Sequence, residues 1–353
     1  MGQSPDSSSY NNNCIGLPLV QGNADMCERI ATPQRYTSQP TKICEAGSII
    51  LSVRAPVGTV GKTFQKICLG RGVCGITSKN IEFMYQYLLN NENSWRHIEQ
   101  GGTFTAINSD DIKSFPIILP SLPEQKKIAD FLSLIDQRIE KQRQLVESLK
   151  KYKRGLFLKL YNDSEKKSYK ICDLGKYCAT GALSKDDIDV SGKYPCILYG
   201  ELFTKYGEVI KQVVSRTNVL PTYLSGTNEI LFPSSTTADA QSLIFPSSLK
   251  IKNISLGGDL FTIKLKNEFD SDFISYLVNF EYKNTLARYA QGITIIHLHY
   301  TDIKEQVIDI PNVDTQFNIS GVMRKIETII EMNINELNSL LLMKKGFLQK
   351  MFI

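Results

Sequence analysis

One glycine-rich stretch of the sequence could bind phosphate groups. Gly58-Thr59-Val60-Gly61-Lys62-Thr63 follows an apolar run and resembles a phosphate-binding loop, but the complete pattern requires a glycine where this chain has Pro56. Residues 64–69 read as strand or loop, so the helix N-terminus that completes a phosphate cradle is missing. The stretch therefore predicts no nucleotide hydrolysis.

The other reactive side chains form no catalytic constellation. Gly2-Gln3-Ser4-Pro5 departs from G-x-S-x-G, and the three histidines include no H-E-x-x-H pair. His297 and His299 lie two apart on a probable strand, but an isolated pair is more often surface decoration than a metal site. The eight cysteines contain no C-x-x-C pair, which favours buried cytosolic thiols over zinc. No G-x-G-x-x-G opens a helix, so we expect no catalysis, metal or cofactor.

Composition describes an ordinary globular protein whose charge is unevenly placed. No apolar run approaches the roughly 20 residues that span a bilayer, and the N-terminus is polar, which predicts a cytoplasmic protein. The net charge is +5, yet the segment from Glu124 to Lys170 alone holds 13 Lys/Arg against 7 Asp/Glu. A basic helix fits a phosphate backbone, although a solvated helix face explains such charges equally well.

The elements that would position any site come in two copies. The segments Ser121–Tyr161 and Asn312–Phe352 match without a gap at an offset of 191 residues, so that Pro120 corresponds to Pro311 and Gln125 to Gln316. A self-match of this length predicts two copies of one unit. Each copy is a globular domain followed by a long helix.

The first long helix has a clear start and an apolar seam. Ser121-Leu122-Pro123-Glu124 forms an S-x-x-E capping box with proline in the first turn. Apolar residues then recur with coiled-coil spacing at Ile128, Ile135, Ile139, Leu149, Tyr152 and Leu156. At 1.5 Å per residue the helix spans roughly 55 Å. Because one domain cannot cover so long a stripe, we expect the two helices to pack against each other.

Polar residues interrupt the seam at corresponding places. Gln142 and its repeat partner Asn333 both stand where an apolar residue is due. We hypothesise that they hydrogen-bond across a pseudo-two-fold axis and fix the register. The alternative, that both face solvent where the stripe drifts, is about equally supported.

Each globular part predicts a mixture of strands and one helix. In the first part we expect strands at 48–53, at 67–77 with breaks at Gly70 and Gly72, and at 115–119, with a helix at 80–91. In the second we expect strands at 194–202, 209–214, 229–233, 243–246 and 293–297, with a helix at 272–289. The fold class is mixed α/β, with two repeated domains separated by two long antiparallel helices. The predicted segments are domain 1 at 1–119, a helix at 120–165, domain 2 at 166–311 and a second helix at 312–353.

With the repeat established, the chain resembles the DNA-specificity subunit of type I restriction–modification systems. The first domain is similar to that family's target-recognition domains at Gly2–Pro5, Gly16–Pro18, Gln21–Asp25, Pro40–Lys42 and Ser52–Gly58. The stretch Ile118–Ala129 looks like the start of the family's central helix, and Tyr194-Pro195 with Tyr199-Gly200 also fits.

The resemblance implies a non-catalytic DNA-binding subunit. Each target-recognition domain would read one half of a bipartite site in the major groove of double-stranded DNA. The helix pair would set the spacing of the half-sites, which face one side of the duplex when about 34–36 Å apart. Two methyltransferase subunits would dock on the helices, and restriction/translocase subunits would join that core. Gly155 and Gly346 would let a partner helix approach closely, or they simply end the regular helix.

One departure from the family pattern concerns the start of the first repeat. The second repeat has a lead-in, Tyr169–Thr180, ahead of Gly181, whereas only Met1 precedes Gly2. We expect a late start codon or a truncation to account for this difference.

Candidate DNA contacts are polar side chains on loops, because Arg reads guanine, Asn and Gln read adenine, and Lys, Ser and Thr often bind phosphates. In domain 1 they are Ser4, Tyr10, Asn11, Gln21, Asn23, Arg54, Arg71 and Thr103. In domain 2 they are Lys185, Tyr199, Lys205, Tyr206, Ser234, Ser235, Thr236, Gln241 and Thr294.

Two other functions compete with DNA recognition. The runner-up is a coiled-coil adaptor whose paired domains bind protein, and selection of a bipartite DNA site distinguishes the two. A self-sufficient modification enzyme fails because no methyl-donor motif is present. The target sequence itself does not follow from the residues.

Overall fold

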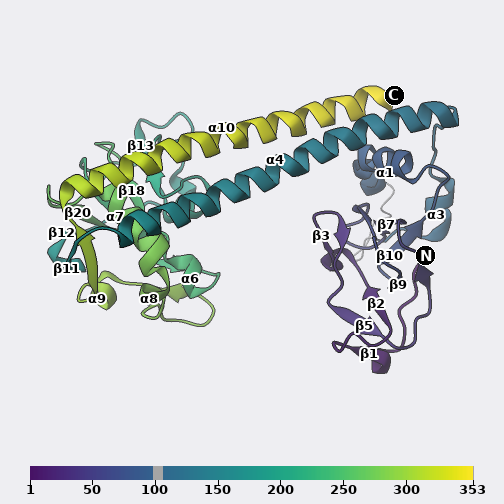
Figure 1. The fold of residues 1–353 in the computed structure, drawn as a ribbon, viewed down its shortest axis with the longest axis horizontal. Helices are drawn as coiled ribbons and strands as arrows, with labels where there is room; N and C mark the ends of the chain where they lie inside the picture. The colour runs from purple at the N-terminus through teal and green to yellow at the C-terminus, as the bar shows by residue number, and fades with distance from the viewer. Residues whose placement is uncertain (98–105, 353) are drawn as a thin grey trace. The chain divides into compact units, whose positions relative to one another are not determined.

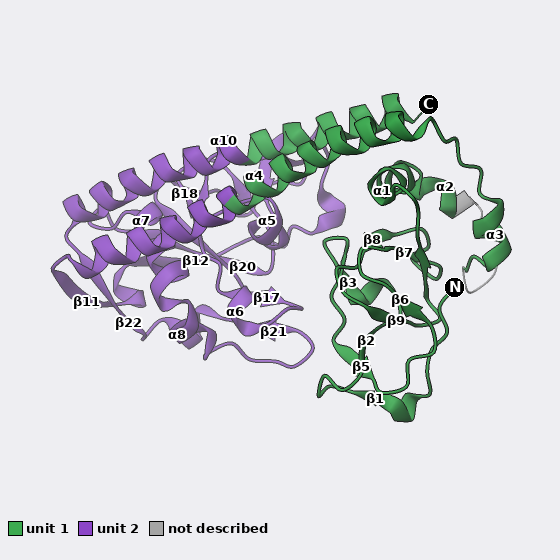
Figure 2. Ribbon diagram, turned by 45° about the vertical axis from the view of Figure 1, so that its right-hand side comes forward, with its two compact units in different colours: residues 1–144, 334–353 green, residues 145–333 purple. Residues whose placement is uncertain are grey.

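The computed structural model describes residues 1–97 and 106–352 and divides the chain into two compact units. Unit 1 comprises residues 1–144 and 334–353, and unit 2 comprises residues 145–333 (Figure 2). The two long helices, α4 (Leu122–Asn162) and α10 (Val313–Met351), therefore each contribute to both units (Figure 1). The predicted division into two domains and two separate helices remains a prediction, because each compact unit includes part of both long helices.

Unit 1 is built around two five-stranded sheets. The first has the order β1-β5-β2-β9-β6, with β1 (Tyr10–Asn11), β5 (Arg35–Thr37), β2 (Leu17–Val20), β9 (Ile67–Leu69) and β6 (Ile43–Cys44). The second has the order β10-β7-β8-β4-β3, with β10 (Val73–Ile76), β7 (Ile49–Ser52), β8 (Val60–Lys62), β4 (Ile30–Ala31) and β3 (Met26–Cys27). All four residues of β7 are buried, as expected for a central strand.

Among the residues that the structure describes, three short α-helices complete the globular part of unit 1: α1 (Ile81–Asn90), α2 (Glu92–His97) and α3 (Ser109–Ser114). Asn80 caps α1 by accepting a hydrogen bond from the Phe83 amide. Trp95 is buried and stacks on Phe115 with ring centroids 4.0 Å apart. The core between α1 and the second sheet includes Leu51, Val60 and Leu88 among its members.

Unit 2 contains a larger set of strands and helices. One sheet has the order β12-β20-β16-β18-β14, with β12 (Gly175–Ala179), β20 (Leu260–Leu265), β16 (Glu229–Pro233), β18 (Ser247–Leu249) and β14 (Val209–Ile210). A second has the order β15-β13-β19, with β15 (Ser215–Thr217), β13 (Tyr194–Ile197) and β19 (Ser255–Leu256). Two strand pairs are β11 (Lys166–Lys170) with β22 (Val307–Pro311) and β17 (Ser235–Thr236) with β21 (Ile296–His297). The helices are α5 (Tyr199–Thr204), α6 (Ala240–Leu243), α7 (Ser271–Leu277), the π-helix Val278–Tyr282, α8 (Lys283–Ala287) and α9 (Tyr300–Ile303).

The two units share one strand topology. In unit 1, β7 pairs antiparallel with β10 and β8, and β8 pairs parallel with β4. In unit 2, β16 pairs antiparallel with β20 and β18, and β18 pairs parallel with β14. The smaller sheets also correspond, because β2 lies between antiparallel β5 and parallel β9 as β13 lies between β15 and β19. The internal repeat is thus a repeat of structure as well as sequence.

Equivalent ion pairs join α4 to α10 within each unit. In unit 1, Lys344 Nζ lies 2.6 Å from Asp136, which also accepts a 2.7 Å hydrogen bond from Gln86 of α1. In unit 2, Lys153 Nζ lies 3.1 Å from Glu327 and 3.0 Å from Glu208. At the offset of 191 residues, Asp136 corresponds to Glu327 and Lys153 to Lys344. Each pair therefore has a counterpart related by the internal repeat, and the two helices run antiparallel.

Removal of Lys153 should destabilise unit 2 in a pH-dependent manner. Burial raises the pKa of Glu327, while Lys153 opposes that shift. Lys153→Met removes the ammonium group that lies closest to two half-buried carboxylates, Glu208 and Glu327, although Lys211 remains 4.0 Å from Glu327. We expect a loss of about 2 kcal/mol at neutral pH. A raised pKa favours the protonated carboxyl in the folded state, so the loss should shrink as the pH falls towards about 5. Chemical denaturation at both pH values measures the effect, and a larger loss in acid would contradict it.

The matched variant Lys344→Met tests the counterpart in unit 1. Asp136 is about one-third exposed, so solvent screens its charge and we expect a smaller loss, about 1 kcal/mol. Trp95 is the single tryptophan and lies in unit 1, so its fluorescence should report this variant more directly than Lys153→Met. If both variants change the fluorescence transition equally, the two ion pairs do not stabilise the two units separately.

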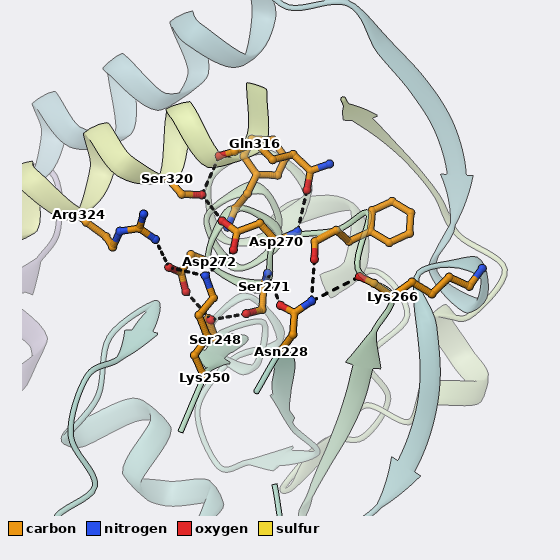
Figure 3. A network of polar contacts seen from close by, with 12 residues as sticks. Asn228, Ser248, Lys250, Lys266, Asp270, Ser271, Asp272, Gln316, Ser320 and Arg324 are labelled. Atoms are coloured by element: carbon orange, nitrogen blue, oxygen red, sulfur yellow. Dashed lines mark hydrogen bonds and ion pairs between the residues drawn. The ribbon is translucent and has the colours of Figure 1, made fainter. Parts of the chain in front are cut away.

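A buried polar network holds the first half of α10 against unit 2 (Figure 3). Asp270 is 1% exposed; it pairs with Lys250 and accepts hydrogen bonds from Ser320 Oγ at 2.5 Å and the Phe273 amide at 3.3 Å. Its own amide donates to Gln316 Oε1 at 2.8 Å. Asp272, also buried, pairs with Arg324 at 2.5 Å and Lys250 at 3.0 Å. Because every charge has a partner, the network can remain inside the unit.

Several predicted elements are confirmed and others are wrong. The helix at 80–91 and the strand at 229–233 form as expected, and the run at 67–77 breaks at its glycines into β9 and β10. The predicted strand at 194–202 turns into α5 after Ile197, because Glu201 caps the Leu198 amide and starts a helix. The strand predicted at 243–246 does not form, because Asp239 caps the start of α6 and that helix extends to Leu243. Of 209–214 only β14 is strand.

The first repeat also lacks the strand expected at 115–119. Its counterpart β22 forms a strand because β11 pairs with it over five residues. Residues 115–119 have no such partner among the described residues, and they remain extended without a ladder.

The seam of α4 differs in part from the prediction. Tyr152 is 59% exposed, and Lys153 takes the buried position because two carboxylates neutralise it. One turn later Phe157 is fully buried against Phe273 and Phe280. Gly155 and Gly346 lie inside α4 and α10, so the interpretation that they end the regular helix is wrong. Within the described residues, no helix is long and apolar enough to cross a membrane.

Candidate nucleic-acid interface

A polar cavity of about 550 Å³ opens in unit 1 where the parallel strands β2 and β9 end. Its lining brings three arginines together from separate parts of the chain: Arg35 on β5, Arg54 after β7, and Arg71 in the turn after β9. Gln21, Asn23 and Asp25 line it from the segment after β2. Four of the predicted contacts, Gln21, Asn23, Arg54 and Arg71, therefore share one site.

Local hydrogen bonds fix the backbone of this cavity. The Asp25 carboxylate accepts from the Gln21 amide at 2.6 Å and the Gly22 amide at 3.2 Å, which shapes the turn after β2. Gln21 Nε2 donates to the Tyr10 hydroxyl at 2.8 Å. The Arg71 amide donates to Ser4 Oγ at 3.1 Å. Ser4 and Tyr10, which the sequence predicts as contacts, thus lie beside the cavity and position its members.

The cavity of unit 1 carries an excess of positive charge. Among the residues that the structure describes, none of the guanidinium groups of Arg35, Arg54 and Arg71 has a carboxylate within 4.0 Å. Asp25 supplies the one negative charge of the lining and is engaged with backbone amides. Unpaired arginines in a concave site attract phosphates and can donate two hydrogen bonds to guanine.

Unit 2 has a cavity at the corresponding position, beside the parallel strands β13 and β19. It measures about 830 Å³, and Lys185, Tyr199 and Lys205 line it together with Glu201, Ser215 and Asp259. In unit 1, Arg35 of β5 pairs with Leu19 of β2. At the corresponding place in unit 2, Ser215 of β15 pairs with Cys196 of β13. The two sites are therefore the same feature of the repeat with different side chains.

The second cavity differs from the first in its electrostatics. Lys205 Nζ lies 2.6 Å from the Glu201 carboxylate and 2.9 Å from Ser215 Oγ, and Ser215 Oγ also donates to Glu201. Glu201 and Asp259 balance Lys185 and Lys205 in formal charge. Apolar side chains from Leu183, Ile188 and Leu198 complete the lining. Such a surface suits the exocyclic amino and methyl groups of bases better than bare phosphates.

The remaining predicted contacts lie elsewhere. Ser234 lines a separate cavity of about 570 Å³ with Tyr177, His299 and Tyr300. Asn11 forms a turn by accepting from the amides of Asn13 and Ile15, and the Tyr206 hydroxyl accepts from the Val214 amide at 3.2 Å. Ser235 and Thr236 form β17, Gln241 lies in α6, and Thr294 is exposed. Thr103 lies outside the described residues.

The histidine pair and the cysteines have structural surroundings. His297 ends β21 and His299 caps α9, with rings stacked 6.1 Å apart, so the two do not share one strand as predicted. Burial raises the pKa of the Cys74 and Cys196 thiols to about 11, so both stay protonated near neutral pH. Gln142 and Asn333 fall in different units, so their hydrogen bond stays a prediction.

Sequence reasoning missed Arg35, Glu201, Ser215 and Asp259. Neither β5 nor β15 carries a strand signal in its residue pattern, so the residues that lie opposite β2 and β13 could not be foreseen.

The chain consists of two α/β domains that each present a cavity at the end of a parallel strand pair. The family pattern described as the type I restriction modification DNA specificity domain matches residues 4–151 and 163–341. The chain therefore belongs to the type I restriction–modification DNA specificity family.

Two relatives from Methanocaldococcus jannaschii are similar over part of their length. A protein provisionally assigned as the type I restriction enzyme MjaX specificity subunit is 40% identical over 160 residues, which cover 44% of this chain and 38% of the relative. The type I restriction enzyme MjaIX specificity subunit is 30% identical over 144 residues, covering 39% of this chain and 33% of the relative. The matches thus span well under half of the curated relatives.

Solved structures agree in fold over the whole chain. The type I restriction–modification S subunit from M. genitalium has a TM-score of 0.57 at 16% identity, covering 100% of this chain and 92% of that one. A chain from a study of complex assembly and conformational transition in a type I system has a TM-score of 0.59 at 13% identity, covering 99% and 93%. At these identities the likeness shows the fold alone.

Proposed function

We propose that the chain is the DNA-recognition subunit of a type I restriction–modification complex, with each unit reading one half of a bipartite site in the major groove. The observation that carries this proposal is the pair of cavities at equivalent positions of the two units. Their linings differ, as two readers of different half-sites require. No catalytic step is assigned to the chain.

The long helices would bind the partners that perform the chemistry. Within each unit, α4 and α10 leave large apolar side chains exposed after packing on each other, including Leu134 at 64%, Met332 at 65% and Leu342 at 71%. Apolar helix faces of this kind fit partner helices. A methyl group added at Gly155 or Gly346 would meet no atom within 4 Å beyond its own stretch of helix, which leaves room for close approach. We assign this surface to two methyltransferase subunits, which restriction/translocase subunits would join.

Domain exchange tests the modular interpretation. We expect that replacing residues 1–118 by the equivalent domain of another specificity subunit changes one half of the methylated site and leaves the other half and the spacing unchanged. Sequencing of methylated DNA from cells that express the hybrid with its methyltransferase subunit measures this. If both halves change, modular recognition is wrong. If the chain selects no DNA even with that subunit, an adaptor that binds protein becomes the better description.

A further inference from the structure

One carboxylate in the cavity of unit 2 remains available for a ligand. The lining of this cavity includes two acidic residues, Glu201 and Asp259. Glu201 is buried and already accepts hydrogen bonds from Lys205 and Ser215. Among the residues that the structure describes, the Asp259 carboxylate has no hydrogen-bond or ion-pair partner. Asp259 is exposed and also lines the neighbouring cavity of about 570 Å³, so it offers a free acceptor to a ligand in either cavity.

The backbone of Asp259 adopts a conformation that favours glycine. Its φ angle is +56°, in the left-handed region, where the Cβ atom of most residues is crowded by the following carbonyl oxygen. Hydrogen bonds hold the main chain there: the Ser234 amide donates to the Asp259 carbonyl at 2.8 Å, and the Gly258 amide donates to the Leu183 carbonyl at 3.1 Å. Aspartate reaches this region most readily when its side chain hydrogen-bonds to nearby backbone, and within the described residues Asp259 makes no such bond. The turn itself therefore gives no reason for a carboxylate at this position.

The equivalent turn of unit 1 carries a side chain of opposite charge. Residues 69–72 of unit 1 and residues 256–259 of unit 2 leave equivalent strands, β9 and β19, of the two parallel pairs. The carbonyl group of the last residue accepts a hydrogen bond from the residue after β7 in unit 1, at 2.9 Å, and from the residue after β16 in unit 2, at 2.8 Å. Arg71 of the first turn lines the cavity of unit 1, and Asp259 of the second lines the cavity of unit 2. The same turn thus presents a hydrogen-bond donor in one unit and an acceptor in the other.

We propose that Asp259 reads a cytosine in the half-site of unit 2 by accepting a hydrogen bond from the N4 amino group in the major groove. The inference rests on the proposed function and names the base that this cavity recognises. An ionised carboxylate only accepts hydrogen bonds, so it pairs with a base edge that donates. In the major groove cytosine presents its amino group, whereas adenine places the N7 acceptor beside its amino group. Guanine presents two acceptors and thymine an acceptor and a methyl group, so both repel or fail to satisfy the carboxylate.

The sign of the expected effect separates base reading from general electrostatics. A negative charge repels the phosphate backbone, so the loss of Asp259 should leave binding to unrelated DNA equal or tighter. Binding to the cognate site should nevertheless weaken by about tenfold, because the cytosine amino group loses its acceptor. Opposite changes in the two affinities cannot come from net charge alone.

The chain assembled with its methyltransferase subunit provides the test, with binding measured to DNA that carries each of the four bases at every position of the half-site. The half-site of unit 2 is the half that stays unchanged when residues 1–118 are exchanged. We expect one position at which the unsubstituted chain prefers cytosine by at least about tenfold. Asp259→Gly should reduce this preference to within about twofold and leave the half-site of unit 1 unchanged. Asp259→Asn should shift the preference towards adenine, because an amide both donates and accepts.

The variant Asn253→Gly is a matched control. Asn253 is exposed in unit 2, has a φ angle of +63° and lies outside the linings of both cavities. Glycine relieves the same backbone crowding at either position, so neither variant should lower the midpoint of unfolding. We expect Asn253→Gly to keep every base preference. A purely structural Asp259 would give the reverse result, with a lower midpoint for Asp259→Gly and intact base preferences.

Three further results would overturn the inference. In the first, Asp259→Gly leaves the preference at every position of the half-site unchanged. In the second, the position that it affects prefers guanine or thymine in the unsubstituted chain. In the third, the change falls in the half-site of unit 1. If the unsubstituted chain selects no bipartite site, the proposed function itself is wrong and the inference fails with it.

Discussion

Substitution of the three cavity arginines in unit 1 should abolish specific DNA binding. We expect the triple variant Arg35→Ala/Arg54→Ala/Arg71→Ala to bind its cognate DNA about a thousandfold more weakly when assembled with the methyltransferase subunit. Each well-placed arginine contributes about 1–3 kcal/mol, whether it donates to guanine or to phosphate. The three guanidinium groups converge on one cavity and are unpaired among the described residues, so no internal partner offsets their loss.

Fluorescence anisotropy at several salt concentrations measures this loss and separates its causes. If the arginines contact phosphates, the salt dependence of binding should flatten by about one unit for each contact removed. If they read bases, the salt slope should stay and discrimination against altered half-sites should fall. The variant Lys66→Ala/Lys79→Ala/Lys113→Ala removes the same charge from unit 1 outside the cavity. Equal losses in both triple variants would mean that net charge, and not the cavity, governs binding.

Single substitutions within the set rank the arginines. Hydrogen bonds hold the backbone at both positions: the Arg71 amide donates to Ser4, and Arg54 forms a β-bridge with Ala106. We therefore expect Arg71→Ala to relax specificity at one base position, which selection from a randomised half-site would reveal.

Loss of Asp270 should produce the largest fall in stability. Asp270→Ala removes the buried partner of Lys250, the acceptor for Ser320 and the N-cap of α7 at once. We expect unit 2 to lose about 3 kcal/mol, since breaking a buried ion pair costs about 3–5 kcal/mol and Lys250 is one-third exposed. Asp239→Ala offers a matched control, because Asp239 also caps a helix but is exposed, and we expect a clearly smaller loss there.

Two spectroscopic probes can follow the unfolding of the two units. Circular dichroism reports both units, while Trp95 fluorescence reports unit 1. Asp270→Ala should lower the midpoint of the dichroism transition more than that of the fluorescence transition. A loss no larger than that of Asp239→Ala would show that the network is neutral on balance and that apolar packing alone holds α10 to unit 2.

The architecture could be predicted because the sequence contains an internal repeat. The gapless offset of 191 residues identified the repeat, and the capping box at Ser121 located the start of α4. Periodicity succeeded for α1 and β16, whose apolar spacing is clear. It failed at 194–202, where Glu201 starts α5 inside the apolar run, and at 243–246, where α6, which Asp239 caps at its start, extends to Leu243. A cap depends on one polar side chain and its hydrogen bond to the backbone, and the spacing of apolar residues gives no information about it.

The candidate site could be predicted only in part. Gln21 and Arg71 are fifty residues apart, and they share a cavity because β2 and β9 pair in parallel. That pairing depends on tertiary structure, so residue type alone could not show which candidates share the cavity and which, like Asn11, lie in an isolated turn. Lys153 was missed for a related reason, since its two carboxylate partners lie far away in sequence.

The ion pairs between α4 and α10 constrain how the spacer can change in length during evolution. Asp136 and Lys344 lie in unit 1, whereas Lys153 and Glu327 lie in unit 2, so each pair fixes the register of α4 against α10 inside its own unit. A change in helix length that shifts the two helices past each other inside one unit parts the ion pair of that unit. Length variants that keep the register inside both units should therefore retain more of their stability than variants that do not.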